Sequence, residues 1–470
     1  MKRLVAFLLC TVMVGATTVG CSNTESSSSG TTSQETESLA SEDNTASIDI
    51  SGQKIVVCTE SGEAADGVGA QIDAFKEKYG CDVELVDIPA DVYKTKIQTD
   101  LAAQSGSYDV IVGTCDFALQ FKESGLLENL LDYSNNTALA DPEYNVEDFI
   151  PVTIDRYYND DRSYLCAYPF KSDVQIIFYR KDLMEDPEEQ AAFKEKYGYD
   201  LEPAKSWQMY FDIAEFFTRP EDDFYGTALM MKRGCDQTSC NFYTRLLGTG
   251  QEMFEEIDGK YKPIINNENG VKVLQSFRDE LVNYAVPGSD NFEYYEANQA
   301  FNDGRCMQVI TWLGAYPTSQ KEENSKVAGK VGAMACPGWE DGDKDGGMLG
   351  GWAVVLPADA QNKEAGYKFA EFCSSAEGEK LKVSSGCFPS RTSVLEDPDS
   401  EYPEYFPIVL EALEAGVAAP SWAEWNELNV TLTEYVSAAG TGVMEPQAAL
   451  DECVEQWNSV LSEAGLLYEE

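Results

Sequence analysis

The feature that most constrains the fold of this chain is the alternation of two patterns: short continuous apolar runs, and segments in which apolar residues recur at helical spacing. Three short apolar runs are typical of buried strands, at 54–58, 82–86 and 108–112. Between them, apolar side chains recur at helical spacing, first Val68, Ile72, Phe75 and Tyr79 and then Tyr93, Ile97 and Leu101. Gly80 ends the first of these predicted helices. Strand, helix, strand, helix, strand predicts a parallel sheet with helices on its faces.

Sheets of this kind bind ligands beyond the carboxyl ends of their strands. Those ends are Thr59 and Glu60 after the first predicted strand and 113–116 after the third. The same helical spacing predicts two later helices, one through Ala365, Phe369 and Phe372 and one from Pro446 through Leu450, Cys453, Trp457 and Leu461.

Composition excludes several classes of function. The chain has 470 residues, 34 Lys and Arg, 82 Asp and Glu and no histidine, for a formal charge of −48. Without histidine there is no Ser-His-Asp or Cys-His catalysis and no His-zinc site. The negative charge repels phosphate backbones, which disfavours a nucleic-acid partner. An apolar content of 43% excludes a disordered acidic chain, and the length suits two or three domains.

The N-terminus is typical of an exported protein. Lys2 and Arg3 precede an apolar run at 4–14 and a small-residue exit, so we interpret residues 1–20 as a secretory signal peptide. Cys21 after Val-Gly resembles the lipobox of bacterial lipoproteins, in which this cysteine carries the lipid. Residues 21–47 are almost entirely polar and are expected to form a disordered, lipid-anchored stalk on the outer face of the cell membrane. The folded body begins near Ile48.

Eleven of the thirteen cysteines remain after Cys10 in the signal peptide and Cys21. An odd number cannot pair completely, and most lie beside apolar residues, where a thiol packs as a small hydrophobe. We expect mostly free thiols. A bridge between Cys235 and Cys240 stays open, because sequence alone does not assign connectivity.

Four motifs follow the predicted sheet in order. They are Tyr168-Pro169 with the strand running to Leu183, the segment 301–307 with Trp312, Gly350-Gly351-Trp352 with the later helix around Phe369, and 388–394 around Arg391. Together with the lipobox, they resemble family 1 of the bacterial extracellular solute-binding proteins, in the branch that includes maltose-binding-protein-like lipoproteins of ABC importers. The resemblance covers nearly the whole mature body.

The resemblance implies a two-lobed periplasmic-binding-protein-like α/β fold, each lobe a mainly parallel sheet flanked by helices, with a hinge between. Lobe one is expected at 48–168 and 350–400, and lobe two at 172–345 and 405–470. It also implies a receptor, not an enzyme, that holds a carbohydrate in the interlobe cleft and delivers it to a membrane permease. We expect a monomer without a cofactor. No Gly-x-x-x-x-Gly-Lys-Ser/Thr loop occurs, so ATP hydrolysis belongs to a partner.

Carboxylates suit a sugar site because each accepts strong hydrogen bonds from hydroxyl groups. By the resemblance, Asp116 aligns with a sugar-binding aspartate, Asp173 follows Tyr168-Pro169 where the family has an acidic contact, and Glu60 lies in the first ligand loop. Asp116 and Asp173 are expected to face each other across the cleft.

Aromatic faces complete such a site by covering the C–H side of a sugar ring. Trp312 and Trp352 match family positions and are the main candidates, with Trp422 behind them and Tyr93 as a weaker one. Arg391 is either a hydrogen-bond donor in the cleft or a brace for the hinge, and we prefer the brace.

The segment 341–346 is similar to the start of a calcium loop, but its twelfth position is Trp352 where calcium needs a bidentate glutamate. We therefore predict no metal site.

Two alternatives remain open. The same fold would also suit a polyamine or other cationic solute, which aromatic walls and carboxylates attract. An exported glycosidase with paired carboxylates is the third hypothesis, although nothing in the chain identifies such a pair.

Overall fold

The computed structural model describes residues 48–340, 343, 345–420, 422 and 424–469. The predicted signal peptide, lipid attachment at Cys21 and stalk lie outside the described residues, and so does part of the calcium-like segment. No helix among the described residues is long and apolar enough to cross a membrane.

The first of two main sheets contains the predicted strands. Its spatial order is β2-β1-β3-β12-β4. The strands are β1 (Lys54–Glu60), β2 (Asp82–Ile88), β3 (Val110–Thr114), β12 (Trp352–Val355) and β4 (Tyr168–Lys171). β1 pairs in parallel with β2 and β3, which confirms the predicted strand-helix-strand unit. β12 pairs antiparallel with β3 and β4.

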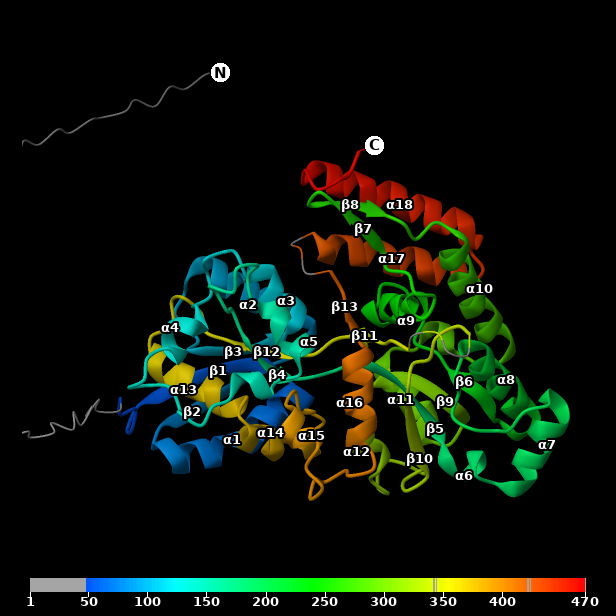
Figure 1. Ribbon diagram of the computed structural model, residues 1–470, viewed down its shortest axis with the longest axis horizontal. Coiled ribbons are helices and arrows are strands. Elements are labelled where there is room, and N and C mark those ends of the chain that lie inside the picture. Colours follow the sequence, from blue (N-terminus) through cyan, green and yellow to red (C-terminus); the bar gives the residue numbers. More distant parts are fainter. Residues whose placement is uncertain (1–47, 341–342, 344, 421, 423, 470) are drawn as a thin grey trace, which may run out of the picture. The chain divides into compact units, whose positions relative to one another are not determined.

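Helices cover both faces of this sheet. α1 and α14 lie on one side, and α2 and α3 on the other (Figure 1). The helices of this part are α1 (Glu63–Tyr79), α2 (Ala90–Ala103), α3 (Cys115–Phe121), α4 (Leu130–Ser134), α5 (Pro151–Ile154), α13 (Lys363–Cys373), α14 (Ala376–Lys382) and α15 (Thr392–Leu395). α1 ends where predicted, because Gly80 adopts a left-handed conformation with φ of 65°.

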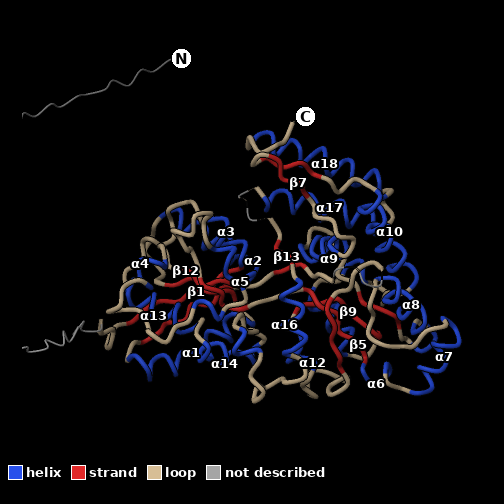
Figure 2. Tube along the Cα trace, viewed as in Figure 1, coloured by secondary structure: helices blue, strands red, loops and turns tan. Residues whose placement is uncertain are grey.

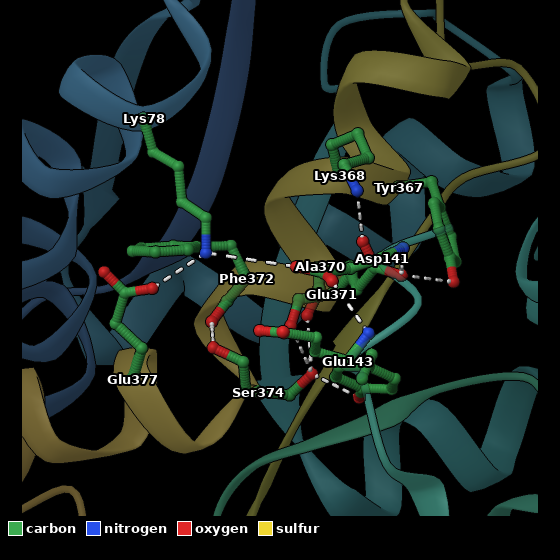
Figure 3. Close-up of polar contacts among 12 residues, drawn as sticks. Lys78, Asp141, Glu143, Tyr367, Lys368, Ala370, Glu371, Phe372, Ser374 and Glu377 are labelled. Carbon is green, nitrogen blue, oxygen red and sulfur yellow. Dashed lines mark hydrogen bonds and ion pairs between the residues drawn. The ribbon is translucent and has the colours of Figure 1, made fainter. Parts of the chain in front are cut away.

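A polar network anchors α13 beneath the first sheet (Figure 3). Glu371 is buried and accepts hydrogen bonds from Tyr367 OH at 3.1 Å and from the backbone N–H of Asp141 at 2.8 Å. Lys368 Nζ forms an ion pair with the same carboxylate at 2.5 Å. These contacts tie the helix that follows β12 to the segment that contains Asp141.

The second sheet has the order β10-β5-β9-β6. Its strands are β10 (Val331–Ala335), β5 (Gln175–Arg180), β9 (Cys306–Trp312) and β6 (Tyr225–Ala228). β5 pairs antiparallel with β10 and β9, and only β6 with β9 is parallel. The expected α/β architecture is confirmed, but the sheets are mixed rather than mainly parallel, because strands that enter from the other sheet run against their neighbours.

Helices also enclose the second sheet, as Figure 2 shows. They are α6 (Lys181–Met184), α7 (Pro187–Tyr197), α8 (Trp207–Phe217), α9 (Asp236–Leu247), α10 (Glu268–Asn283), α11 (Tyr294–Asn302), α12 (Ala315–Ser319), α16 (Phe406–Ala415), α17 (Trp425–Gly440) and α18 (Pro446–Glu463). Two small sheets complete the fold, one of β7 (Phe254–Ile257) with β8 (Lys260–Pro263) and one of β11 (Met348–Leu349) with β13 (Val417–Ala418). The predicted helices at 365–372 and from Pro446 are α13 and α18.

Short segments carry the chain from one sheet to the other. Residues 172–174 separate β4 of the first sheet from β5 of the second, and Gly350 and Gly351 separate β11 from β12 of the first sheet. The two segments lie side by side, since the backbone N–H of Gly350 donates to the carbonyl oxygen of Asp173 at 3.0 Å. Residues close to both sheets therefore gather at this crossing.

All eleven cysteines among the described residues are unpaired, and ten of them are buried. Cys235 and Cys240 are therefore not bridged. Burial raises the pKa of the Cys58 thiol to about 12, which keeps this thiol protonated and unreactive at neutral pH.

Candidate functional site

A cavity of about 330 Å³ lies between the two sheets, and both contribute to its walls. From the first sheet come the ends of β1, β3 and β4 and the start of β12. From the second come the end of β9 and the first turns of α9 and α11. The charged, amide and large aromatic side chains that line it are Glu60, Glu63, Asp116, Lys171, Asp173, Asp236, Gln237, Tyr294, Tyr295, Trp312 and Trp352.

The carboxyl ends of parallel strands explain the acidic side chains on the first-sheet side. Glu60 is the last residue of β1, and Asp116 follows β3 in the first turn of α3. β1 and β3 are adjacent and parallel, so their ends open at the same edge of the sheet. The side chains beyond them meet in one crevice.

Two tryptophans form aromatic walls from opposite sheets. Trp312 ends β9, and its indole N–H donates to Gln237 Oε1. Trp352 begins β12. Gly350 permits the close approach of these parts, because a Cβ atom there would lie 2.8 Å from the Trp312 ring. Gly351 has φ of +113°, and a Cβ atom would lie 2.8 Å from the Lys171 carbonyl oxygen, so only glycine suits this turn.

Three carboxylates in the cavity have no Lys or Arg nitrogen within 4 Å among the described residues: Glu60, Asp116 and Asp236. Burial raises the pKa of Glu60, and repulsion from Asp236 adds to the effect. Desolvation likewise raises the pKa of Asp236, with repulsion from Asp116 adding to it. Asp236 Oδ1 accepts a hydrogen bond from Gln237 Nε2 at 3.2 Å. Lone pairs on these carboxylates remain available to accept hydrogen bonds from a ligand.

Lys171 lies between two acids at the base of the cavity. Its Nζ is 2.8 Å from Glu63 Oε2 and 3.4 Å from Asp173 Oδ2. Asp173 Oδ1 also accepts a hydrogen bond from the backbone N–H of Leu313 at 2.9 Å. Burial raises the pKa of Asp173 to about 6, although the charge of Lys171 opposes this shift. The network thus links β4, the crossing segment and the end of β9.

Two hydrogen bonds connect elements of the two sides directly. Tyr294 OH on α11 donates to Glu63 Oε1 on α1 at 3.2 Å. Beside a smaller neighbouring cavity, Lys94 Nζ on α2 donates to Asn426 Oδ1 on α17 at 2.5 Å. A cavity lined with aromatic rings and carboxylates and bridged by such contacts suits a small polyhydroxylated molecule.

Comparison with known proteins agrees with this geometry. The model of the family described as bacterial extracellular solute-binding protein matches residues 59–380. The chain belongs to this family. It is 24% identical over 402 residues to the mannitol-binding protein of Pseudomonas aeruginosa, covering 81% of this chain and 86% of the relative.

Two further comparisons extend over nearly the whole chain. The galactooligosaccharide-binding protein of Bacillus subtilis is 23% identical over 463 residues, which is 97% of this chain and 96% of the relative. The structure of an ABC transporter solute-binding protein from Agrobacterium radiobacter K84 in complex with ribitol matches with a TM-score of 0.74. That match has 23% identity and covers 87% of this chain and 99% of the other. It confirms the two-lobed fold expected for this solute-binding family.

Five of the predicted site residues of this family member line the cavity together: Glu60, Asp116, Asp173, Trp312 and Trp352. Three of them lie at strand termini, Asp116 lies in the first turn of α3 and Asp173 in the crossing segment. Proximity in space does not test whether they bind a ligand, so their roles stay predictions.

Three other predicted residues lie elsewhere. Tyr93 is buried behind the wall, where its hydroxyl donates to the Val112 carbonyl oxygen at 2.6 Å and its ring lies 6.4 Å from that of Trp352. Trp422 lines a smaller neighbouring cavity that shares Asp116 and stacks on the Tyr261 ring at 3.7 Å.

Arg391 is 2% exposed and does not line the main cavity. Its guanidinium lies 3.9 Å from the centre of the Phe149 ring, and Nη1 is 3.3 Å from Asp148 Oδ2. These contacts lie away from the cavity, which disfavours a hydrogen-bond donor in the cleft, and they stay within the expected lobe one, so a brace for the hinge stays a prediction.

Sequence reasoning missed several cavity residues: Glu63, Lys171, Asp236, Gln237, Tyr294 and Tyr295. Glu63 lies three residues beyond β1, in the first turn of α1, so the rule on parallel strand ends could have found it. Lys171 ends β4, which the local patterns did not predict. The other four are close to the cavity only because the two sheets meet. The Tyr294-Tyr295 pair at the start of α11 is a local signal, since aromatic side chains are common in the walls of ligand cavities.

No group of three or more Cys, Asp or Glu side chains among the described residues is arranged to hold a metal ion. The calcium-like segment at 341–346 falls partly outside the described residues.

Proposed function

We propose that this protein captures a carbohydrate or polyol in the cavity between its sheets and delivers it to the membrane permease of an ABC importer. The observation that carries the proposal is the cavity itself, with tryptophan rings on both walls and carboxylates that have free lone pairs. Relatives that bind mannitol and galactooligosaccharide support this class of ligand. The protein acts as a monomeric receptor and not as an enzyme.

Glu60, Asp116 and Asp173 accept hydrogen bonds from ligand hydroxyls in this proposal, while Trp312 and Trp352 cover the apolar faces of the ligand. Replacing Asp116 by alanine leaves hydroxyls unmatched and weakens binding by about tenfold or more, from a loss of about 1.5–3 kcal/mol. Isothermal titration calorimetry measures this loss. Retention of the parent affinity by both Asp116→Ala and Asp173→Ala would show that the site is assigned wrongly.

We further propose that 48–168 with 350–400 and 172–345 with 405–470 move as two lobes. The crossing segments at 172–174 and at Gly350 and Gly351 are the natural hinge, since three residues or fewer separate the strands there. Hinge closure around a ligand is a well-known motion of binding proteins with two lobes. Small-angle scattering measures the motion as a smaller radius of gyration with ligand than without it.

Export and attachment to the outer face of the cell membrane complete the proposal, through a signal peptide at 1–20 and a lipid on Cys21. Two acyl chains give lasting attachment, whereas one is marginal. Cys21→Ser should therefore move the protein from the membrane fraction to the soluble fraction. Firm attachment of a purified chain that carries no lipid would contradict this part.

A cationic solute such as a polyamine is the second candidate. It is favoured by the three cavity carboxylates that lack a basic partner among the described residues. The two candidates differ in their response to salt, because ionic strength screens the attraction of a cation and hardly affects a neutral sugar.

A thermal-shift screen tests the proposal. The panel contains D-mannitol, ribitol, lactose, galactobiose, maltose and spermidine, at low and high salt. A ligand at 100 times its dissociation constant stabilises the folded protein by about 2.7 kcal/mol, which raises its melting temperature. A shift with spermidine alone, lost at high salt, would replace the carbohydrate by the cation. Hydrolysis of chromogenic glycosides by the purified protein would instead favour the glycosidase.

A further inference from the structure

Lys171 holds an unusual position at the base of the cavity. It is the last residue of β4, directly before the segment that crosses to the second sheet. The residue is 5% exposed, yet it lines the cavity and is the only Lys or Arg among the residues that do so. A buried ammonium that faces a cavity requires partners for its donors, since an unpaired buried charge is strongly unfavourable.

The partners within the protein use only part of its capacity. Burial alone would lower the pKa of Lys171, but Glu63 and Asp173 outweigh burial and raise the pKa, so the ammonium stays charged. An ammonium group has three N–H donors. One donates to Glu63 Oε2 at 2.8 Å and a second points toward Asp173 Oδ2 at 3.4 Å. Among the described residues, no further acceptor contacts Nζ, which leaves a donor for the cavity.

We propose that Lys171 is a ligand-binding residue that donates a hydrogen bond to an acceptor oxygen of the bound molecule. This inference rests on the proposed function and narrows it. Glu60 and Asp116 accept from ligand hydroxyls, whereas Lys171 requires a lone pair, so the ligand must present both. A hydroxyl group of a carbohydrate or polyol meets this requirement, because its oxygen accepts a hydrogen bond from Lys171 while its neighbours donate to the carboxylates. A fully protonated polyamine has no acceptor and places a like charge beside Lys171.

The competing role for Lys171 is purely structural, to balance the charges of Glu63 and Asp173. The two roles differ in one measurable respect. A binding residue discriminates against a ligand that lacks the one oxygen it contacts, because its donor is then left unpaired. A structural lysine shows no preference among ligand oxygens.

Lys171→Met keeps the length of the side chain and removes the donors. Lys382→Met is the matched control, because Lys382 is also fully buried, donates to the Cys373 carbonyl oxygen at 2.7 Å and does not line the cavity. The probes are D-mannitol, lactose and maltose, each with its monodeoxy analogues, titrated by calorimetry into the folded variants.

We expect Lys171→Met to weaken binding of the probe that the parent binds by about ten- to a hundredfold. One monodeoxy analogue should bind the parent weakly and lose no further affinity in Lys171→Met. Lys382→Met should bind as the parent does. Lys171→Arg keeps the charge and moves the donors, so it should lose the discrimination at that position even if Lys171→Met does not fold.

Parent affinity in Lys171→Met, or an equal loss for every analogue, would overturn the inference and leave the proposed function intact. So would unchanged discrimination in Lys171→Arg. If the parent binds none of the three probes, the proposed ligand class fails and the inference fails with it.

Discussion

Replacing Tyr294 by phenylalanine removes one hydroxyl from the contact between the two sides of the cavity, and we expect it to weaken ligand binding. Tyr294 OH donates to Glu63 Oε1 at 3.2 Å. Tyr294 belongs to α11 beside the second sheet and Glu63 to α1 beside the first. If the lobes separate without ligand, this hydrogen bond forms only on closure and adds to the free energy of binding.

The magnitude follows from the environment of Glu63. A hydrogen bond to a charged group contributes about 1.5–3 kcal/mol to stability. The Glu63 side chain is 32% exposed and keeps its ion pair with Lys171 at 2.8 Å, so water and the lysine partly compensate for the lost hydroxyl. We therefore expect the lower end of the range, about 1.5 kcal/mol, or about a tenfold weaker dissociation constant.

Calorimetric titration with the panel member that raises the melting temperature most is the assay. Tyr199→Phe is the matched control, because Tyr199 OH also donates to a carboxylate, Asp212 Oδ2 at 2.7 Å, but both residues lie beside the second sheet and neither lines the cavity. The control should bind as the parent does. Parent affinity in Tyr294→Phe, or the same loss in both variants, would refute the coupling between this hydrogen bond and closure.

Three further outcomes are expected. Trp457 is fully buried and donates to the Leu428 carbonyl oxygen at 2.8 Å, so Trp457→Ala should lower the free energy of unfolding by about 3–5 kcal/mol in chemical denaturation and leave the dissociation constant of the folded protein unchanged. Trp352→Ala should instead raise the dissociation constant and change the free energy of unfolding only slightly. Equal effects of both substitutions on these two quantities would contradict the assignment of Trp352 to binding and Trp457 to stability. Burial raises the pKa of Asp173 to about 6, so the carboxylate that faces Lys171 and Glu63 loses its charge as the pH falls, and affinity should drop by about tenfold between pH 7.5 and 5. The raised pKa also means that the folded state holds this proton more tightly than the unfolded state, so the contribution of Asp173 to stability should grow as the pH falls from above 6 toward 4. Asp173→Asn should remove both dependences, and a profile that the substitution leaves unchanged would assign them to another group.

Local patterns in the sequence were sufficient for β1, β2 and β3 of the first sheet and for the helices between them. Apolar runs and helical spacing are visible within a few neighbouring residues, because they reflect only the burial of one face of a helix or of a whole strand. The same reasoning located the start of α18 at Pro446 and the end of α1 at Gly80. Gly80 ends α1 because glycine adopts the left-handed backbone conformation at low cost. It also placed Glu60 and Asp116 at one edge, because parallel strands must end together.

Strand direction in the second sheet needed more than local pattern. β5 and β9 are nearly continuous apolar runs, and such runs do not distinguish parallel from antiparallel neighbours. The direction depends on where the chain enters the sheet, which the crossing segment at 172–174 decides. The expectation of mainly parallel sheets failed for this reason.

Sequence alone therefore determined the strand-helix-strand unit of the first sheet, the edge of that sheet that lines the cavity and, through four motifs in order, the family. Tertiary structure alone decided which side chains share the cavity. Lys171 and Tyr294 are 123 residues apart in the chain, and both contact Glu63. Lys171 reaches it because β4 and α1 pack in the same part of the fold, and Tyr294 reaches it because the two sheets meet across the crossing segments. The charge balance at the base of the cavity depends on distances of about 3 Å between groups with no common local pattern, and such distances exist only in the folded molecule.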